Sequence, residues 1–162
     1  MYDIGAEETL ADLKKYCLDH VVLSPSQWNK YHSYYALSWT TVKFDHSKKS
    51  SIPDNKMGVY SFVVKPSIAD HPECAYLLYV GKAEEQSLRT RFSQYFVEKS
   101  LLKGRPKVQK MLTLWSSHLW FCYAVVDETI KINDIENNLI ESYIPPFNNE
   151  YPADIRSAIK AW

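Results

Sequence analysis

The stretch YLLYVGKAEEQSLRTRFSQYF (Tyr76–Phe96) carries the pattern that decides the fold. Its first residues predict a strand, and Gly81 then permits a sharp exit from that strand. A helix follows, on which the large apolar side chains share one face. Around this strand-to-helix turn the chain places Lys82 and two arginines, Arg89 and Arg91, beside two tyrosines. This clustering of basic and aromatic side chains at one turn indicates a functional site.

Charge is unevenly distributed along the chain. The 162 residues include 19 Lys and Arg and 19 Asp and Glu, and a net charge of zero argues against a protein that coats nucleic acid. Between Lys82 and Lys110, however, eight basic residues stand against three acidic ones, a local excess of five. A solvated helix face is one interpretation of this excess, and an anionic partner bound at one place is the other.

Size and composition limit the class of protein. The length suits one domain, and 46% apolar residues are enough for a packed core. No apolar run approaches the roughly 18 residues that a membrane span needs, and no signal-peptide pattern opens the chain, so we expect a cytoplasmic protein without a membrane partner. Cys17, Cys74 and Cys122 are odd in number and far apart, which fits neither a disulfide framework nor a zinc site.

The pattern along the chain predicts an α+β domain. Three segments have the composition of strands, the first two of them paired antiparallel, in a small antiparallel or mixed sheet flanked by helices. Residues 36–44 fit either a strand or an irregular segment. Expected strands cover residues 57–64, 75–81 and 118–126, and expected helices cover 6–20, a segment from Pro25, one around Phe92, one around Met111, 132–143 and a short one near the C-terminus.

Two short motifs lie on the predicted pair of strands. GVY (Gly58–Tyr60) belongs to the first and YVG (Tyr79–Gly81) ends the second, so the two tyrosines are expected close together. These motifs resemble the two halves of the GIY-YIG nuclease motif. RFSQYF (Arg91–Phe96), ENNLI (Glu136–Ile140) and PPFN (Pro145–Asn148) resemble the family's further elements in the family's order. The resemblance covers about 57–149 and is especially close to the N-terminal nuclease domain of the bacterial excision-repair incision subunit.

The resemblance implies a metal-dependent endonuclease that hydrolyses phosphodiester bonds in DNA, with RNA not excluded as substrate. It implies that Glu136 binds Mg²⁺ or Mn²⁺ and that Arg91 binds the scissile phosphate. Either Tyr60 or Tyr79 would act as general base or orient the water. A tyrosine of ordinary pKa, about 10, needs nearby cations to favour the phenolate. The remaining catalytic candidates are Lys82, Tyr95 and Asn148.

About two extra residues separate Gly81 from Arg91 relative to the family pattern, so Arg89 competes for the catalytic role. Arg91 is favoured because it stands four residues before Tyr95, which places both on adjacent turns of one helix. The basic residues assigned to nucleic-acid binding are Arg89, Lys103, Arg105 and Lys107. Structural interpretations stand beside the catalytic ones: half-buried strand aromatics for Tyr60 and Tyr79, a solvated turn for Lys82, the core for Tyr95 and a turn or cap for Asn148.

Two acids lie on the helix expected at residues 132–143. At about 100° per residue, Glu136 falls within the apolar stripe and Glu141 falls on the opposite face. A carboxylate held against the sheet costs desolvation free energy unless a cation or hydrogen bonds offset it, which favours Glu136 as the metal ligand. The alternative is a capping box, in which Asn133 caps the helix and Glu136 stands three residues later.

The residues before position 56 match no part of that family's core. We therefore divide the chain into an N-terminal helical extension, residues 1–55, for substrate binding or dimerisation, and a GIY-YIG-like nuclease domain, residues 56–162. The compact size resembles the family's small restriction enzymes, which favours a role in restriction or in phage or mobile-element defence. A homodimer would let both strands be cut. The alternative function is a catalytically idle module, on the same fold, that binds nucleic acid or another protein.

Overall fold

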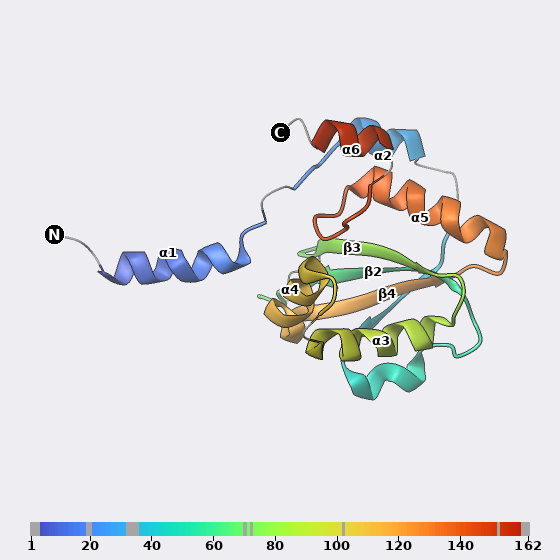
Figure 1. Ribbon diagram of the computed structural model, residues 1–162, viewed down its shortest axis with the longest axis horizontal. Helices are drawn as coiled ribbons and strands as arrows, with labels where there is room; N and C mark the ends of the chain where they lie inside the picture. Colours follow the sequence, from blue (N-terminus) through green and yellow to red (C-terminus); the bar gives the residue numbers. More distant parts are fainter. Residues whose placement is uncertain are drawn as a thin grey trace.

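The computed structural model describes residues 4–18, 21–31, 36–69, 71, 73–101, 103–151 and 153–159 (Figure 1). Its strands are β1 (Trp39–Lys43), β2 (Gly58–Val64), β3 (Tyr76–Ala83) and β4 (Leu119–Val125). Its helices are α1 (Ile4–Tyr16), α2 (Pro25–Tyr31), α3 (Leu88–Ser100), α4 (Pro106–Leu114), α5 (Thr129–Tyr143) and α6 (Ala153–Ile159), with short 3₁₀ helices η1 (His46–Ser51) and η2 (Ser116–His118).

The four described strands form one antiparallel sheet in the order β1-β4-β2-β3. The α+β class and the antiparallel pairing of β2 with β3 are confirmed, but the prediction of three strands is wrong. The additional strand is β1, which pairs with β4 along its whole length, from Trp39 opposite Ala124 to Lys43 opposite Trp120. Three of its five residues are exposed, so this edge strand lacks the apolar run that would have identified it.

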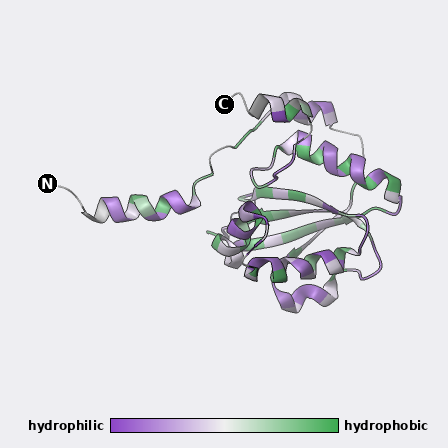
Figure 2. Cartoon of the chain, in the orientation of Figure 1, coloured by the Kyte–Doolittle hydropathy of each residue, from purple (hydrophilic) through white to green (hydrophobic). Residues whose placement is uncertain are grey.

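Helices cover the two faces of the sheet, and the alternation of side chains along each strand separates two cores. On β2, Tyr60 and Phe62 face α3 and α4 in a core rich in aromatic rings. Val59 faces the other way, toward Ile132 and Ile135 of α5. Figure 2 shows hydrophobic colour along the strands and hydrophilic colour on η1, which packs against α3.

Helix α5 covers one face of the sheet and carries both Glu136 and Glu141. It begins at Thr129, three residues earlier than expected, and ends before Pro145 as expected. Asn133 therefore lies inside the helix, where it cannot be the N-cap, and the capping-box interpretation of Glu136 is excluded. Helix α2 packs against α5, and Lys30 lies 4.0 Å from the Glu141 carboxylate.

The segment before residue 56 contributes to the sheet as well as supplying helices, because β1 and η1 both come from it. In α1 the side chains from Glu7 to Tyr16 are all exposed, and Figure 1 shows most of this helix apart from the rest of the molecule. At its C-terminal end the Tyr16 ring lies edge-on to Trp115, with the ring centroids 6.1 Å apart. Residues 19 and 20 of the helix expected at 6–20 lie outside the described residues. Within the described part of the chain, no helix is long and apolar enough to cross a membrane.

Candidate active site

Both motif glycines are required by close contacts within the sheet. A Cβ on Gly58 would lie 2.0 Å from the carbonyl oxygen of Ala124 on the neighbouring β4. A Cβ on Gly81 would lie 2.6 Å from the Tyr60 hydroxyl and 2.9 Å from the ring of Tyr79. Strand β3 continues past Gly81 to Ala83, so the expectation that this glycine serves as the exit from the strand is wrong. Its function is to leave space for the two tyrosines.

The Tyr60 hydroxyl is fully buried between Arg91 and Tyr95. The Arg91 Nε donates to the Tyr60 oxygen at 2.8 Å, and the hydroxyls of Tyr60 and Tyr95 are 2.8 Å apart. Burial raises the pKa of Tyr60 well above its ordinary value, and Tyr79 raises it further, while Arg91 acts in the opposite direction. The positive charge of Arg91 therefore does not lower the pKa of Tyr60 below its ordinary value, which a phenolate at this position would require.

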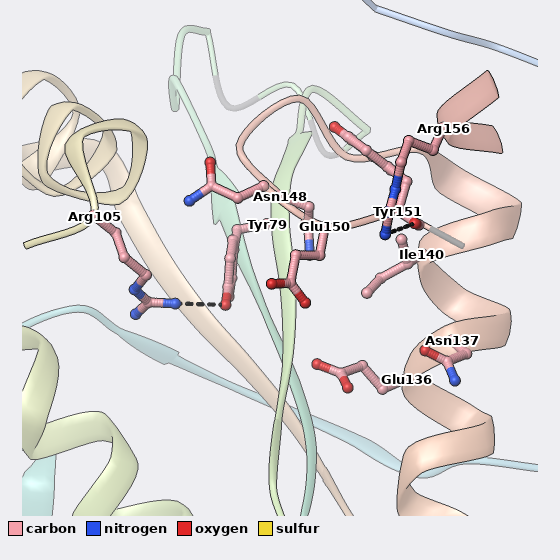
Figure 3. A pocket seen from close by; sticks show the side chains of 10 residues that line it. Tyr79, Arg105, Glu136, Asn137, Ile140, Asn148, Glu150, Tyr151 and Arg156 are labelled. Carbon is pink, nitrogen blue, oxygen red and sulfur yellow. Dashed lines mark hydrogen bonds between the residues drawn. The ribbon is translucent and has the colours of Figure 1, made fainter. Parts of the chain in front are cut away.

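A polar pocket of about 640 Å³ lies at the β3 edge of the sheet (Figure 3). Residues that line it come from β3, the start of α4, α5, the segment after α5, and α6. Figure 3 shows Tyr79 between Arg105 on one side and Glu136 on the other. The pocket thus brings together residues far apart in the sequence, and its lining includes Tyr79, Arg105, Glu136, Asn148, Glu150 and Arg156.

Tyr79 presents its hydroxyl to this pocket, whereas Tyr60 is not among the pocket's lining residues. The ring centroids of the two tyrosines are 6.4 Å apart. Arg105 Nη1 donates to the Tyr79 oxygen at 3.0 Å. The other side of the Arg105 guanidinium is paired with Glu98, from Nε at 2.8 Å and from Nη2 at 2.7 Å. These hydrogen bonds to Glu98 raise the pKa of Arg105 above its ordinary value, so it is charged at any working pH.

Glu136 reaches the pocket from α5 with 16% of its side chain exposed. Burial raises the pKa of this carboxyl above its ordinary value, and Lys82, whose Nζ lies 3.8 Å away, offsets part of that effect. Lys82 is shared, since its Nζ also lies 2.7 Å from Glu84 and donates to Asn133 Oδ1 at 2.6 Å. Lys82 is thus a half-buried cation at the acid and not a freely solvated turn residue.

Asn148 holds the edge of β3 with its side-chain amide. Its Oδ1 accepts from the Val80 N–H at 3.0 Å, and its Nδ2 donates to the Val80 carbonyl at 2.9 Å. The backbone N–H of Phe147 donates to the Leu78 carbonyl at 3.0 Å. Residues 147 and 148 therefore satisfy backbone groups that an edge strand would otherwise leave unpaired. This contact fixes the strand that carries Tyr79.

The four residues assigned to nucleic-acid binding have different environments. Arg89 joins α3 to the segment after η1, donating to the Ile52 carbonyl at 2.7 Å and lying 3.2 Å from the Asp54 carboxylate. Lys103 and Lys107 are exposed. Arg105 lines the pocket in contact with Tyr79. Arg91, in contrast with Arg89, contacts the tyrosine cluster, which is the arrangement expected if Arg91 is the catalytic arginine.

The residues of the pocket fit a hard divalent cation that keeps most of its ligands from water and substrate. Mg²⁺ in phosphoryl-transfer sites is held by one or two carboxylates together with phosphate oxygens and water. Glu136 supplies one such carboxylate, and the desolvation that raises its pKa is the cost that a cation would offset. Among the described residues no group of three or more His, Cys, Asp or Glu side chains could enclose a metal, so a site made wholly of protein ligands does not fit.

Sequence reasoning missed two parts of this site. It assigned Arg105 to the nucleic acid and gave no role to Glu98, because the pairing depends on how the loop between α3 and α4 folds back. It also overlooked the pocket walls supplied by Tyr151 and Arg156 near the C-terminus. A weak indication existed, since Glu98 is one of three acids within the basic stretch and stands seven residues before Arg105.

Comparison with known sequences covers the part of the chain that builds this site. The family model described as a UvrC-like GIY-YIG domain matches residues 56–149, which is more than half of the 162 residues. The matched segment runs from just before β2 to just after Asn148. No curated protein matches the chain.

Proposed function

The chain belongs to the UvrC-like GIY-YIG domain family, and from that membership we propose that it is a divalent-metal-dependent endonuclease that hydrolyses phosphodiester bonds in DNA. The observation that carries the proposal is the pocket at the β3 edge, where Tyr79 and Glu136 lie together, with Arg91 at the adjacent tyrosine cluster. A phosphodiester needs these three kinds of group: one that orients water, one that holds a cation and one that carries positive charge.

Tyr79 is the tyrosine proposed to orient the attacking water. Hydrolysis forms a bond from the water oxygen to phosphorus, breaks one ester bond and transfers a proton from the water to the leaving oxygen. The Tyr79 hydroxyl lines the pocket and retains hydrogen-bonding capacity toward it, so it can hold that water. The Tyr60 hydroxyl is buried and bonded to Arg91 and Tyr95, so its proposed role is to position them.

Positive charge near the pocket would stabilise the charge that develops on the phosphate. Arg91 uses Nε on Tyr60 and Nη1 on Gln94, and its Nη2 makes no hydrogen bond to any other described residue, which leaves it for a phosphate oxygen. Glu136 would hold Mg²⁺ or Mn²⁺, which when bound neutralises charge on the scissile phosphate. Lys82, 3.8 Å away, favours the charged form of the Glu136 carboxyl.

The biological role proposed is restriction or defence against phage or mobile elements. Its support is the N-terminal segment, in which the side chains of α1 from Glu7 to Tyr16 are exposed and available to bind substrate or a second copy. The homodimer belongs to the same proposal, and of residues 1–55 only the helical part can serve it, because β1 and η1 are built into the nuclease domain itself.

Incubation with supercoiled plasmid DNA in Mg²⁺, in Mn²⁺ and in EDTA tests this proposal. We expect nicked or linear products with either metal and none in EDTA. Discrete bands would indicate sequence-specific cutting, and a single-stranded RNA of matched length reports whether RNA is also cut. Robust cutting in EDTA would refute the role of the metal. DNA binding without cutting under every condition would favour the idle-module alternative.

A further inference from the structure

Arg105 has a fixed position in the site, held by both ends of the loop that carries it. It is the N-cap residue of α4, and Glu98 lies in the last turn of α3. Gln109 holds the same loop, since its Nε2 donates to the carbonyls of Glu98 at 3.1 Å and Leu101 at 2.6 Å. The Glu98 side chain is only 14% exposed, which strengthens its pairing with Arg105 relative to a surface ion pair.

The hydrogen bonds of Arg105 account for most of its donors. Of the five N–H groups of a guanidinium, two point to Glu98 and one points to the Tyr79 oxygen. Its guanidinium carbon also lies 5.7 Å from the ring centroids of both Tyr79 and Tyr95. An arginine bound in this way has its charge balanced by a carboxylate and its orientation fixed, which is unlike a flexible cation that follows a phosphate backbone.

We propose that Arg105, held by Glu98, is a positioning residue that fixes the orientation of the Tyr79 hydroxyl in the pocket. This inference rests on the proposed nuclease function and replaces the earlier assignment of Arg105 to the nucleic-acid backbone. Because Arg105 donates to the Tyr79 oxygen, the hydroxyl hydrogen cannot point toward Arg105 and is directed elsewhere. Among the described residues, Arg105 is the hydrogen-bond partner of Tyr79, so the remaining capacity of that hydroxyl is available to water or substrate in the pocket.

A double-mutant cycle on single-turnover plasmid cleavage tests this proposal. Arg105→Lys keeps the charge but cannot hold Glu98 with two donors and reach Tyr79 with a third, so we expect the rate constant to fall about 10- to 100-fold. Tyr79→Phe removes the hydroxyl on which Arg105 acts. The double variant should therefore be no slower than Tyr79→Phe alone.

The affinity for DNA distinguishes positioning from phosphate binding. A positioning residue changes the rate constant and leaves the dissociation constant for DNA within about twofold, with an unchanged salt dependence. A phosphate contact would instead weaken binding, reduce the slope of log affinity against log salt by about one, and retain its effect in the Tyr79→Phe background. That second set of results would overturn the proposal. Lys110→Gln, at an exposed position on α4, controls for the loss of one nearby positive charge.

Two further measurements distinguish failure of the positioning role from loss of folding and from failure of the proposed function. If Arg105→Lys does not fold, as judged by thermal unfolding, Glu98→Gln takes its place in the cycle, since it leaves Arg105 present but weakens its anchor. We expect a smaller rate loss that again disappears in the Tyr79→Phe background. A wild-type protein that cuts DNA while the two substitutions act additively would refute only the positioning role. A wild-type protein that cuts no DNA would refute the proposed function itself.

Discussion

Two tyrosine–arginine pairs lie side by side in this molecule and differ in exposure to the pocket. Tyr60 lies inside the aromatic core, where burial raises its pKa, and Arg91 bonds to it from a half-buried position. Tyr79 belongs to the same core and is 8% exposed, but it lies on the edge strand, where it bonds to Arg105 and also lines the pocket. Similar side chains on adjacent strands thus have different capacities, because access to solvent and substrate decides whether a hydroxyl can act chemically or only hold its neighbours.

The largest contrast is expected between Tyr79→Phe and Tyr60→Phe. Tyr79→Phe should slow cleavage about 10²- to 10³-fold while leaving the unfolding temperature almost unchanged. Tyr60→Phe should instead cost about 1–3 kcal/mol of stability, because it leaves the Arg91 Nε and the buried Tyr95 hydroxyl without a partner. Single-turnover cleavage and thermal unfolding of both variants measure the two effects. If Tyr60→Phe proves the less active of the two while remaining folded, the assignment of roles is reversed.

The second contrast concerns the two arginines on α3. Arg91→Ala should reduce the cleavage rate constant about 10²-fold, because it removes a charge at the tyrosine cluster. Arg89→Ala should retain most cleavage and cost about 1 kcal/mol of stability, because Arg89 bonds to the segment after η1. Parallel rate and unfolding measurements check both. An essential Arg89 with a dispensable Arg91 would contradict the alignment of α3 with the family motif.

The third prediction concerns the effect of the half-buried Glu136 carboxylate on the stability of the fold. Burial raises its pKa above the ordinary 4.5, so its ionised form destabilises the metal-free fold. Glu136→Gln should therefore raise the unfolding temperature at about pH 7.5, and the gain should shrink toward zero as the pH falls to about 4, where the acid is mostly protonated in both states. Thermal unfolding at the two pH values in EDTA measures this. A decrease in stability at the higher pH would show that Lys82 already compensates the buried charge.

The smallest effect is expected from removing residues 1–15. The described side chains of α1 are exposed, so the truncated protein should unfold at nearly the same temperature and cut with the same rate constant. If the extension binds DNA or a second copy, the dissociation constant for DNA or the oligomeric state should change instead. Titration with DNA and sedimentation analysis check these two outcomes. No change in either would show that α1 serves neither purpose.

The sequence predicted the fold most reliably where several local preferences agree. The GVY and YVG strands, their antiparallel pairing and the helix after them follow from composition and period. The period of α5 also placed Glu136 within its apolar stripe, and the structure leaves that side chain half-buried at 16% exposure. Glu141, expected on the opposite face, is little more exposed at 22%, because α2 packs there. β1 was left open because a short, exposed edge strand has little apolar pattern. The role of Gly81 was mistaken because the space it leaves is filled by Tyr60, a contact that only the paired strands create.

The residue types of the candidate site could be predicted from the sequence, but the different roles of its two tyrosines could not. Motif order identified Tyr60 and Tyr79 together, but nothing local distinguishes a buried hydroxyl from one that lines a pocket. That distinction depends on β3 being the edge strand. Arg105 and Glu98 were missed as a pair for a similar reason, since their contact is made by the return of the chain between α3 and α4.

The most direct test of the account is plasmid cleavage in Mg²⁺ by Glu136→Gln, with Glu141→Gln as the matched control on the same helix. Glu141 lies outside the pocket, 4.0 Å from Lys30, so its loss should be nearly neutral. The account predicts that wild type and Glu141→Gln cut DNA at similar rates and that Glu136→Gln is folded but slower by about 10³-fold or more. Cleavage by Glu136→Gln at the wild-type rate would contradict the placement of the metal and of the chemistry at this pocket.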